Sequence, residues 1–136
     1  MFKTLLFPID HSRESMQAAE SVAQLVKTFG SRLVLLSVVE DAADGTASST
    51  DGMASPEAVA ALLTNVQNLF AEQGITAEAI ERQGKPAFTI CDVADETEAD
   101  LIVMGFRGMG LTEEGMADSV TMRVINLSPC PVLVIP

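Results

Sequence analysis

The chain has 136 residues, of which 48% are apolar and 20% charged, and this composition is typical of a compact globular protein and not of a disordered one. Its 8 basic and 19 acidic residues give a net charge of −11, which is the wrong sign for a protein that binds duplex nucleic acid. The length predicts a single domain over residues 1–136 with one core.

In the first half of the chain, continuous apolar runs alternate with segments whose apolar residues have helical spacing. Thr4–Ile9 is a continuous apolar run, typical of a strand buried on both faces. A helix is expected to begin after Ser12 and to end at Gly30, with an inward stripe that includes Met16, Val22 and Val26. A second buried strand is expected at Leu33–Val39. Residues 40–54 carry four acids and no base among small residues, which predicts a flexible, solvated acidic loop.

The second half continues the alternation. Ser55-Pro56-Glu57 is a helix start, and the apolar stripe that follows it runs through Leu69 and Phe70 to a stop at Gly74. Alternating polarity over Ile75–Ile80 predicts a more exposed strand near a sheet edge. The remaining helices are one after Gly84 and one that begins near Asp118 or Ser119 and carries Val120, Val124 and Leu127 inward. Continuous apolar runs at Leu101–Met104 and Val132–Ile135 predict two further strands buried on both faces.

This strict alternation predicts an α/β fold. Strands that alternate with helices form a parallel sheet covered by helices on both faces and joined by right-handed crossovers. In such a sheet, ligands bind beyond the carboxyl ends of the strands, at the point where the strand order reverses. The turns after the strands are therefore the places to search for a site.

The sequence lacks a long apolar segment at its N-terminus and a cysteine motif, and these two absences exclude further classes of protein and site. The apolar run at the N-terminus is short and is interrupted at Pro8 and Asp10, so neither a signal peptide nor a membrane insertion is predicted. Cys91 and Cys130 form no C-x-x-C pair and have no neighbouring metal ligand, so no zinc or thioredoxin-like site is predicted. We expect a reduced, cytoplasmic protein.

The turn after the strand at Leu101–Met104 contains three glycines in six residues, Gly105, Gly108 and Gly110. Glycines allow backbone N–H groups to converge on a phosphate, and Arg107 adds a positive charge there. The turn is not a P-loop, because Leu111 stands where the phosphate-binding Lys would be. A glycine-rich turn that only lets the chain leave the strand sharply is the alternative interpretation.

The segment from Gly105 to Ser119 resembles the nucleotide-binding signature of the universal stress protein family. That signature is a Gly, two residues, a second Gly, nine residues, then Gly and Ser or Thr. Gly105, Gly108 and Ser119 match it, but Asp118 stands in place of the third Gly. LLFPIDHSRES, GKPAFTICDVADETEADLIVMG and SPCPVLVIP also resemble the family's first strand and turn, its third helix and fourth strand, and its last strand.

The resemblance implies a doubly wound five-stranded parallel sheet of strand order 3-2-1-4-5, and a homodimer that forms through the last strand, Val132–Ile135. Many members bind ATP without rapid turnover. Carried over residue by residue, Pro8 and Asp10 would lie by the adenosine, and Val38 or Val39 would line the adenine pocket. The residues implied to hold the phosphates are Gly105, Gly108, Ser119 and Val120, with Arg107 as a neighbour.

Asp118 leaves two outcomes open. Its carboxylate could cap the last helix and fill the anion site itself, with no nucleotide present. Alternatively, a Mg²⁺ ion could bridge Asp118 and the phosphates of a bound ATP.

The resemblance and the two outcomes for Asp118 lead to three candidate functions. The first is a cytoplasmic stress-response or regulatory module whose occupancy by ATP or another adenine nucleotide modulates a protein partner. The alternative is a nucleotide-free dimeric interaction scaffold. A slow ATPase is the least favoured, because no Walker Lys, general base or arginine finger can be named, and we therefore expect no enzyme.

Overall fold

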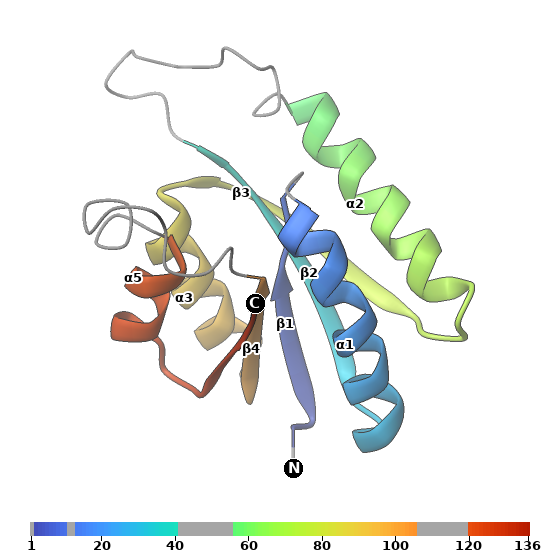
Figure 1. Cartoon of the computed structure of the whole chain (residues 1–136). Coiled ribbons are helices and arrows are strands. Elements are labelled where there is room, and N and C mark those ends of the chain that lie inside the picture. The colour runs from blue at the N-terminus through green and yellow to red at the C-terminus, as the bar shows by residue number, and fades with distance from the viewer. Residues whose placement is uncertain (1, 11–12, 41–55, 106–119) are drawn as a thin grey trace.

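The computed structural model describes residues 2–10, 13–40, 56–105 and 120–136 of the chain. Strands and helices alternate along these ranges, as the sequence predicts (Figure 1). The elements are β1 (Thr4–Pro8), α1 (Arg13–Phe29), β2 (Arg32–Glu40), α2 (Pro56–Ala71), β3 (Ala77–Gly84), α3 (Pro86–Glu96), β4 (Leu101–Gly105), α5 (Val120–Leu127) and β5 (Val132–Ile135).

The strands of the described ranges form one parallel sheet of order β3-β2-β1-β4-β5, which confirms the predicted α/β fold and its 3-2-1-4-5 order. The register places Leu5 of β1 between Leu33 of β2 and Leu101 of β4. Helices cover both faces, α1 and α2 on one and α3 and α5 on the other (Figure 1).

The sheet separates two apolar clusters. On the α1 and α2 side, Phe7 packs edge to face against Phe70, with ring centroids 6.3 Å apart. On the α3 and α5 side, Leu6 and Ile102 pack with Val93 and Val124. Because β1 and β4 alternate their side chains between the two clusters, both of their faces are buried and their sequences are continuous apolar runs.

Two strands differ from their predicted form. No residue of β5 is buried, although the run was expected to be covered on both faces. The physical reason is its position: β5 is at the edge of the described sheet, with β4 as its neighbour on one side. The other edge strand, β3, begins two residues later than predicted and extends to Gly84, because it pairs with β2 from Leu33 to Glu40.

Smaller differences concern the ends of elements and three side chains. Glu40, predicted to begin the acidic loop, is the last residue of β2 and pairs with Gly84, while residues 41–54 of that loop lie outside the described residues. Met16, Leu69 and Leu127 were expected on inward stripes, but each is about two-fifths exposed or more, since the stripe that contacts the sheet is narrower than the apolar stripe of the sequence.

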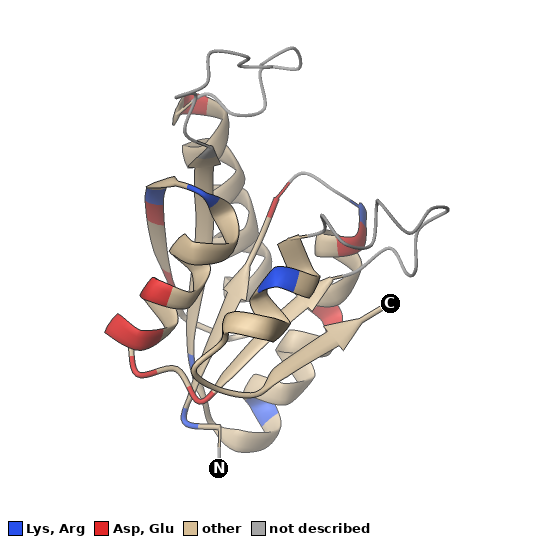
Figure 2. Cartoon of the chain, turned by 90° about the vertical axis from the view of Figure 1, so that its left-hand side faces the viewer, with Lys and Arg blue, Asp and Glu red and all other residues tan. Residues whose placement is uncertain are grey.

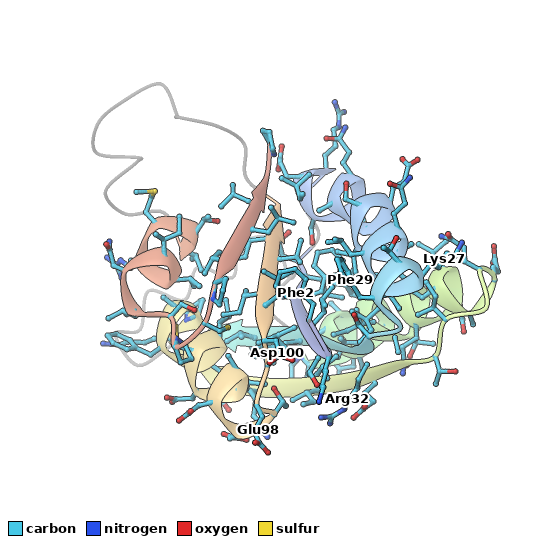
Figure 3. All side chains as sticks on the ribbon, turned by 90° about the horizontal axis from the view of Figure 1, so that it is seen from below. Phe2, Lys27, Phe29, Arg32, Glu98 and Asp100 are labelled. Atoms are coloured by element: carbon cyan, nitrogen blue, oxygen red, sulfur yellow. The ribbon has the colours of Figure 1, made fainter. Side chains whose placement is uncertain are left out.

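The amino ends of the strands close the bottom of the molecule (Figure 3). The Thr4 N–H donates to the Asp100 carboxylate at 3.0 Å, and the Asp100 N–H donates to the Thr4 carbonyl at 2.8 Å, which ties β1 to β4. Phe2 packs edge to face against Phe29 of α1, with ring centroids 5.2 Å apart (Figure 3). Within the described ranges, no helix combines the length and the apolar character that a membrane crossing requires.

Candidate functional site

A cavity of about 220 Å³ lies at the carboxyl ends of β1, β2 and β4. The strand order reverses between β1 and β4, so the cavity is at the position where ligands bind in open parallel sheets. The strands and the turns that follow them contribute Pro8, Ile9, Asp10, Leu36, Val38, Met104 and Gly105. The helices contribute Ser15 of α1, Pro86 and Ile90 of α3, and Val120 and Thr121 of α5.

The inner wall of the cavity is apolar. Leu36, Ile90 and Met104 are buried members of the cluster on the α3 and α5 side of the sheet, and Val38 packs against them. Polar side chains stand at other points of the wall, where Asp10 is exposed and Ser15 and Thr121 are buried. An apolar wall with a few fixed polar groups is the usual composition of a site for a small organic ligand.

The turn from β1 into α1 is held by two backbone donors. The Ile9 N–H donates to the Leu36 carbonyl at 2.8 Å, which extends the β1 and β2 pairing beyond Pro8. The Asp10 N–H donates to Ser15 Oγ at 3.1 Å, and Ser15 is only 5% exposed. These bonds place the Asp10 side chain at the rim of the cavity.

Gly105 is the last residue of β4, and it packs against the first turn of α1. A Cβ at this position would lie 2.6 Å from the Glu14 carbonyl carbon and still closer to its oxygen. Both are backbone atoms, which cannot rotate away. The geometry therefore gives Gly105 a packing role that is independent of any phosphate.

The start of α3 is also built around a glycine. Gly84 has a φ of +153°, and a Cβ there would lie 2.7 Å from Thr89 Oγ1. Lys85 occupies the N-cap position and makes no side-chain capping bond, and Pro86 follows at the first helical turn. Pro86 and, one helical turn later, Ile90 then contact the cavity.

Thr121 in the first turn of α5 is a polar residue in this wall. It is 6% exposed, and within the described ranges no buried side-chain nitrogen or oxygen lacks a hydrogen-bond partner. Sequence reasoning missed Thr121, together with Ile90, because both residues enter the wall from helices and their contribution depends on how α3 and α5 dock.

The structure brings together some of the residues expected at a nucleotide site and separates others. Those in the cavity wall are Pro8, Asp10, Val38, Gly105 and Val120. Val39 is on the opposite face of β2, where it packs against the cluster under α1 and α2. The remaining expected residues, Arg107, Gly108, Asp118 and Ser119, lie outside the described residues.

The two thiols stand apart from the cavity wall. Burial raises the pKa of both Cys91 and Cys130, and nearby negative groups, Asp92 for Cys91 and Asp100 for Cys130, raise it further. Where the structure describes the chain, it brings no three His, Cys, Asp or Glu side chains close enough together to hold a metal ion. A Mg²⁺ site at Asp118 concerns a residue outside those ranges.

Comparisons with known proteins address the whole chain. Residues 1–136 match the Universal stress protein family. A curated relative, Universal stress protein Sll1654 of Synechocystis sp., is 63% identical over 136 residues, which are 100% of this chain and 87% of the relative.

Solved structures share the fold. A universal stress protein in complex with cAMP has a TM-score of 0.78 at 22% identity and covers 99% of this chain and 97% of its own. A universal stress protein family protein from Arabidopsis thaliana with AMP bound has a TM-score of 0.72 at 21% identity. The match covers 98% of this chain and 90% of the Arabidopsis chain. At these identities the likeness shows the fold alone, whereas the family match and the 63% relative cover the full chain. The chain therefore belongs to the universal stress protein family.

Proposed function

We propose that this chain is a cytoplasmic regulatory module that binds an adenine nucleotide in the cavity at the carboxyl ends of β1, β2 and β4. The observation that carries the proposal is the composition of this cavity, an apolar inner wall with polar groups around it at the point of strand reversal. The cAMP and AMP held by two proteins of the same fold support the choice of ligand.

The volume of the cavity and the residues of its wall indicate which part of the nucleotide lies inside it. About 220 Å³ is below the ~300–1,000 Å³ of pockets that enclose a whole drug-sized ligand. The cavity therefore takes the base, with Val38 and Ile90 against its faces, and Asp10 is placed to accept a hydrogen bond from the adenosine. The phosphates extend beyond the cavity, toward the helix N-termini that surround it.

Asp118 decides how tightly the phosphates bind. A carboxylate about 4 Å from a phosphate oxygen costs about 1 kcal/mol when water screens it and up to ~4 kcal/mol at an effective dielectric constant near 20. Binding would then be roughly fivefold to nearly a thousandfold weaker than with a neutral residue. A Mg²⁺ ion between Asp118 and the phosphates would remove this penalty, and Mg²⁺ commonly bridges one or two carboxylates and a substrate phosphate.

The second candidate function is a nucleotide-free dimeric scaffold in which Asp118 satisfies the phosphate-binding amides. The two functions are separated by calorimetric titration of ATP, with and without Mg²⁺, into the wild type and Asp118→Gly. The regulatory module predicts that the wild type binds ATP with Mg²⁺ and that Asp118→Gly binds without it. Binding by Asp118→Gly alone, with or without Mg²⁺, would instead establish the scaffold.

We also propose a homodimer that forms through the outer edge of β5. An unpaired edge strand exposes N–H and C=O groups to a second strand, and charged side chains are the usual protection against such pairing. The other edge strand, β3, carries Glu78, Glu81 and Arg82, but residues 124–136 contain no Lys, Arg, Asp or Glu. The ribbon of β5 is accordingly tan throughout in Figure 2, without the blue or red of a charged residue. The dimer would present its nucleotide sites to a regulated protein partner.

Binding without rapid turnover is the chemistry that we propose. The described wall holds no Lys and no His, and so offers neither the phosphate-binding Lys of a P-loop nor an imidazole base. A bound ATP would act through the conformation that it stabilises, because a ligand shifts a conformational equilibrium by its differential affinity for the two states.

A further inference from the structure

Ser15, in the first turn of α1, is a buried polar residue of the cavity wall and is only 5% exposed. Its Oγ accepts a hydrogen bond from the Asp10 N–H at 3.1 Å. Asp10 and Gly105 belong to the same wall, so residues from the β1 turn, from α1 and from β4 meet around this hydroxyl. Because the hydroxyl has a partner within the protein, its role is found in the group that it holds.

The group that Ser15 holds is the backbone of Asp10 at the point where the chain leaves the sheet. The N–H of the preceding residue, Ile9, still donates to the Leu36 carbonyl of β2 at 2.8 Å. The next N–H, that of Asp10, donates to α1 instead. A backbone donor that leaves a sheet needs a new acceptor, and the Ser15 hydroxyl supplies it. The Asp10 backbone is thereby tied to α1 immediately after its neighbour is tied to β2, which restricts where the carboxylate can point.

The backbone of Ser15 is itself held against the sheet. A Cβ added at Gly105 would lie 3.0 Å from the Ser15 nitrogen and 2.6 Å from the Glu14 carbonyl carbon. The last residue of β4 therefore packs directly against the peptide bond that joins Glu14 and Ser15. Since this contact fixes the first turn of α1 relative to β4, the hydroxyl on Ser15 gives the turn after β1 an anchor of fixed position.

We infer that Ser15 is a positioning residue for the nucleotide: its hydroxyl holds the turn after β1 so that Asp10 presents its carboxylate to the adenosine at the cavity rim. This inference rests on the proposed function and adds a residue that acts on the ligand through Asp10. Asp10 is exposed, so its carboxylate has little packing of its own to orient it. A group that is already held in its bound orientation loses less conformational entropy when the ligand arrives, which strengthens binding.

The test compares two substitutions that remove the same hydroxyl. Ser15→Ala is matched with Ser31→Ala, because Ser31 Oγ donates to the Phe2 carbonyl at 2.6 Å at the amino end of the sheet, away from the cavity. Both variants are titrated with ATP and with adenosine by calorimetry. Ser15→Ala is expected to weaken both ligands by about three- to tenfold, the equivalent of one lost hydrogen bond. Equal affinities of Ser15→Ala and Ser31→Ala for adenosine would overturn the inference.

A double-mutant cycle separates positioning from direct contact with the ligand and from a general effect on the fold. Asp10→Ala removes the carboxylate that Ser15 is inferred to position. In this background Ser15→Ala is expected to cause no further loss of adenosine affinity, because residues that act through one another are not additive. The same three- to tenfold loss with and without the Asp10 carboxylate would show that Ser15 acts by itself, and would overturn the inference.

Hydrogen exchange at the Asp10 amide separates this inference from the proposed function. If the wild type binds neither ATP nor adenosine, the proposed function fails, and the exchange rates of the ligand-free proteins are compared. Residue 15 is not a sequence neighbour of Asp10, so its substitution changes the exchange rate only through the hydrogen bond. Faster exchange of the Asp10 amide in Ser15→Ala than in Ser31→Ala would retain Ser15 as the residue that holds Asp10 in place. Equal rates in the two variants would overturn that role.

Discussion

Gly105 is the residue at which β4 packs against the backbone of α1. Because an added Cβ would overlap the Glu14 carbonyl group, Gly105→Ala must shift α1 or the end of β4. Overpacking of this kind costs about 1–3 kcal/mol of unfolding free energy, which chemical denaturation would measure. The control is Gly30→Ala, where no atom lies within 4 Å and only the positive φ of +63° is strained. A loss at Gly105 of less than ~0.5 kcal/mol would contradict the packing role.

The two thiols give a prediction with a pH dependence. The pKa values of Cys91 and Cys130 are raised above the 9.0 of a free thiol, chiefly by burial, so at pH 8 a smaller fraction of each is the reactive thiolate. Folded protein is therefore expected to react with iodoacetamide more slowly at pH 8 than unfolded protein does, and the folded rate should still be rising above pH 9. A folded rate that has already levelled off at pH 8 would show that the pKa is lowered instead.

At the scale of the element, α3 ends in a turn that favours a glycine but contains Glu98. Glu98 has a φ of +55°, its N–H donates to the Asp95 carbonyl at 3.2 Å, and the Ala99 N–H donates to the Ala94 carbonyl at 2.9 Å. This is a Schellman motif with Glu98 in the left-handed position, where most residues other than glycine are strained. Glu98→Gly removes about 1–2 kcal/mol of strain and adds about 0.5–1 kcal/mol of backbone entropy cost, so it is expected to raise the unfolding free energy by about 0.5–1 kcal/mol.

The control for this prediction is Glu98→Ala. Alanine removes the acidic charge from the helix C-terminus but keeps the Cβ that causes the strain. Thermal unfolding should therefore show a larger gain for glycine than for alanine. Equal gains would assign the effect to the charge and not to the backbone conformation.

The strands that periodicity alone identifies as buried on both faces are those with a neighbour on each side. β1, β2 and β4 have neighbours on both sides and helices on both faces, so their sequences are continuous apolar runs that periodicity identifies. β5 has an equally apolar run but only one described neighbour, and a run of four residues cannot distinguish a central strand from an edge strand. Its exposure depends on its place in the sheet, which is a long-range property.

Some residues of the candidate site could likewise be predicted from the sequence, and others could not. Pro8, Asp10 and Val38 could be predicted, because the topology alone places the ends of β1 and β2 together. Val38 and Val39 could not be separated without the register of β2, which directs them to opposite faces of the sheet. Ile90 and Thr121 enter the wall from helices, and their contribution depends on how α3 and α5 dock against the sheet.

At the scale of the whole molecule, the distribution of charge predicts the assembly. Val134 lies in β5, within the uncharged segment 124–136, so Val134→Glu would bury an unpaired carboxylate in each half of a β5-to-β5 interface. Sedimentation velocity is expected to show a dimer of the 14.4 kDa chain for the wild type and a monomer for this variant. Leu69→Glu, at an exposed apolar position on α2, is the control and should remain a dimer. A dimer of Val134→Glu as stable as the wild type would contradict the β5 interface.

The central claim is that an adenine nucleotide occupies the cavity at the carboxyl ends of β1, β2 and β4. Val38 and Val39 are neighbours in β2, but Val38 contacts this cavity and Val39 packs against the core on the opposite face. Val38→Phe would fill the space of the base, and Val39→Phe adds the same volume elsewhere, at a similar cost of about 1–3 kcal/mol in stability.

The most direct measurement is therefore calorimetric titration of ATP with Mg²⁺ into the wild type, Val38→Phe and Val39→Phe. The account predicts that the wild type and Val39→Phe bind with similar affinity and that Val38→Phe does not bind. Equal binding by Val38→Phe would place the nucleotide elsewhere and contradict the account.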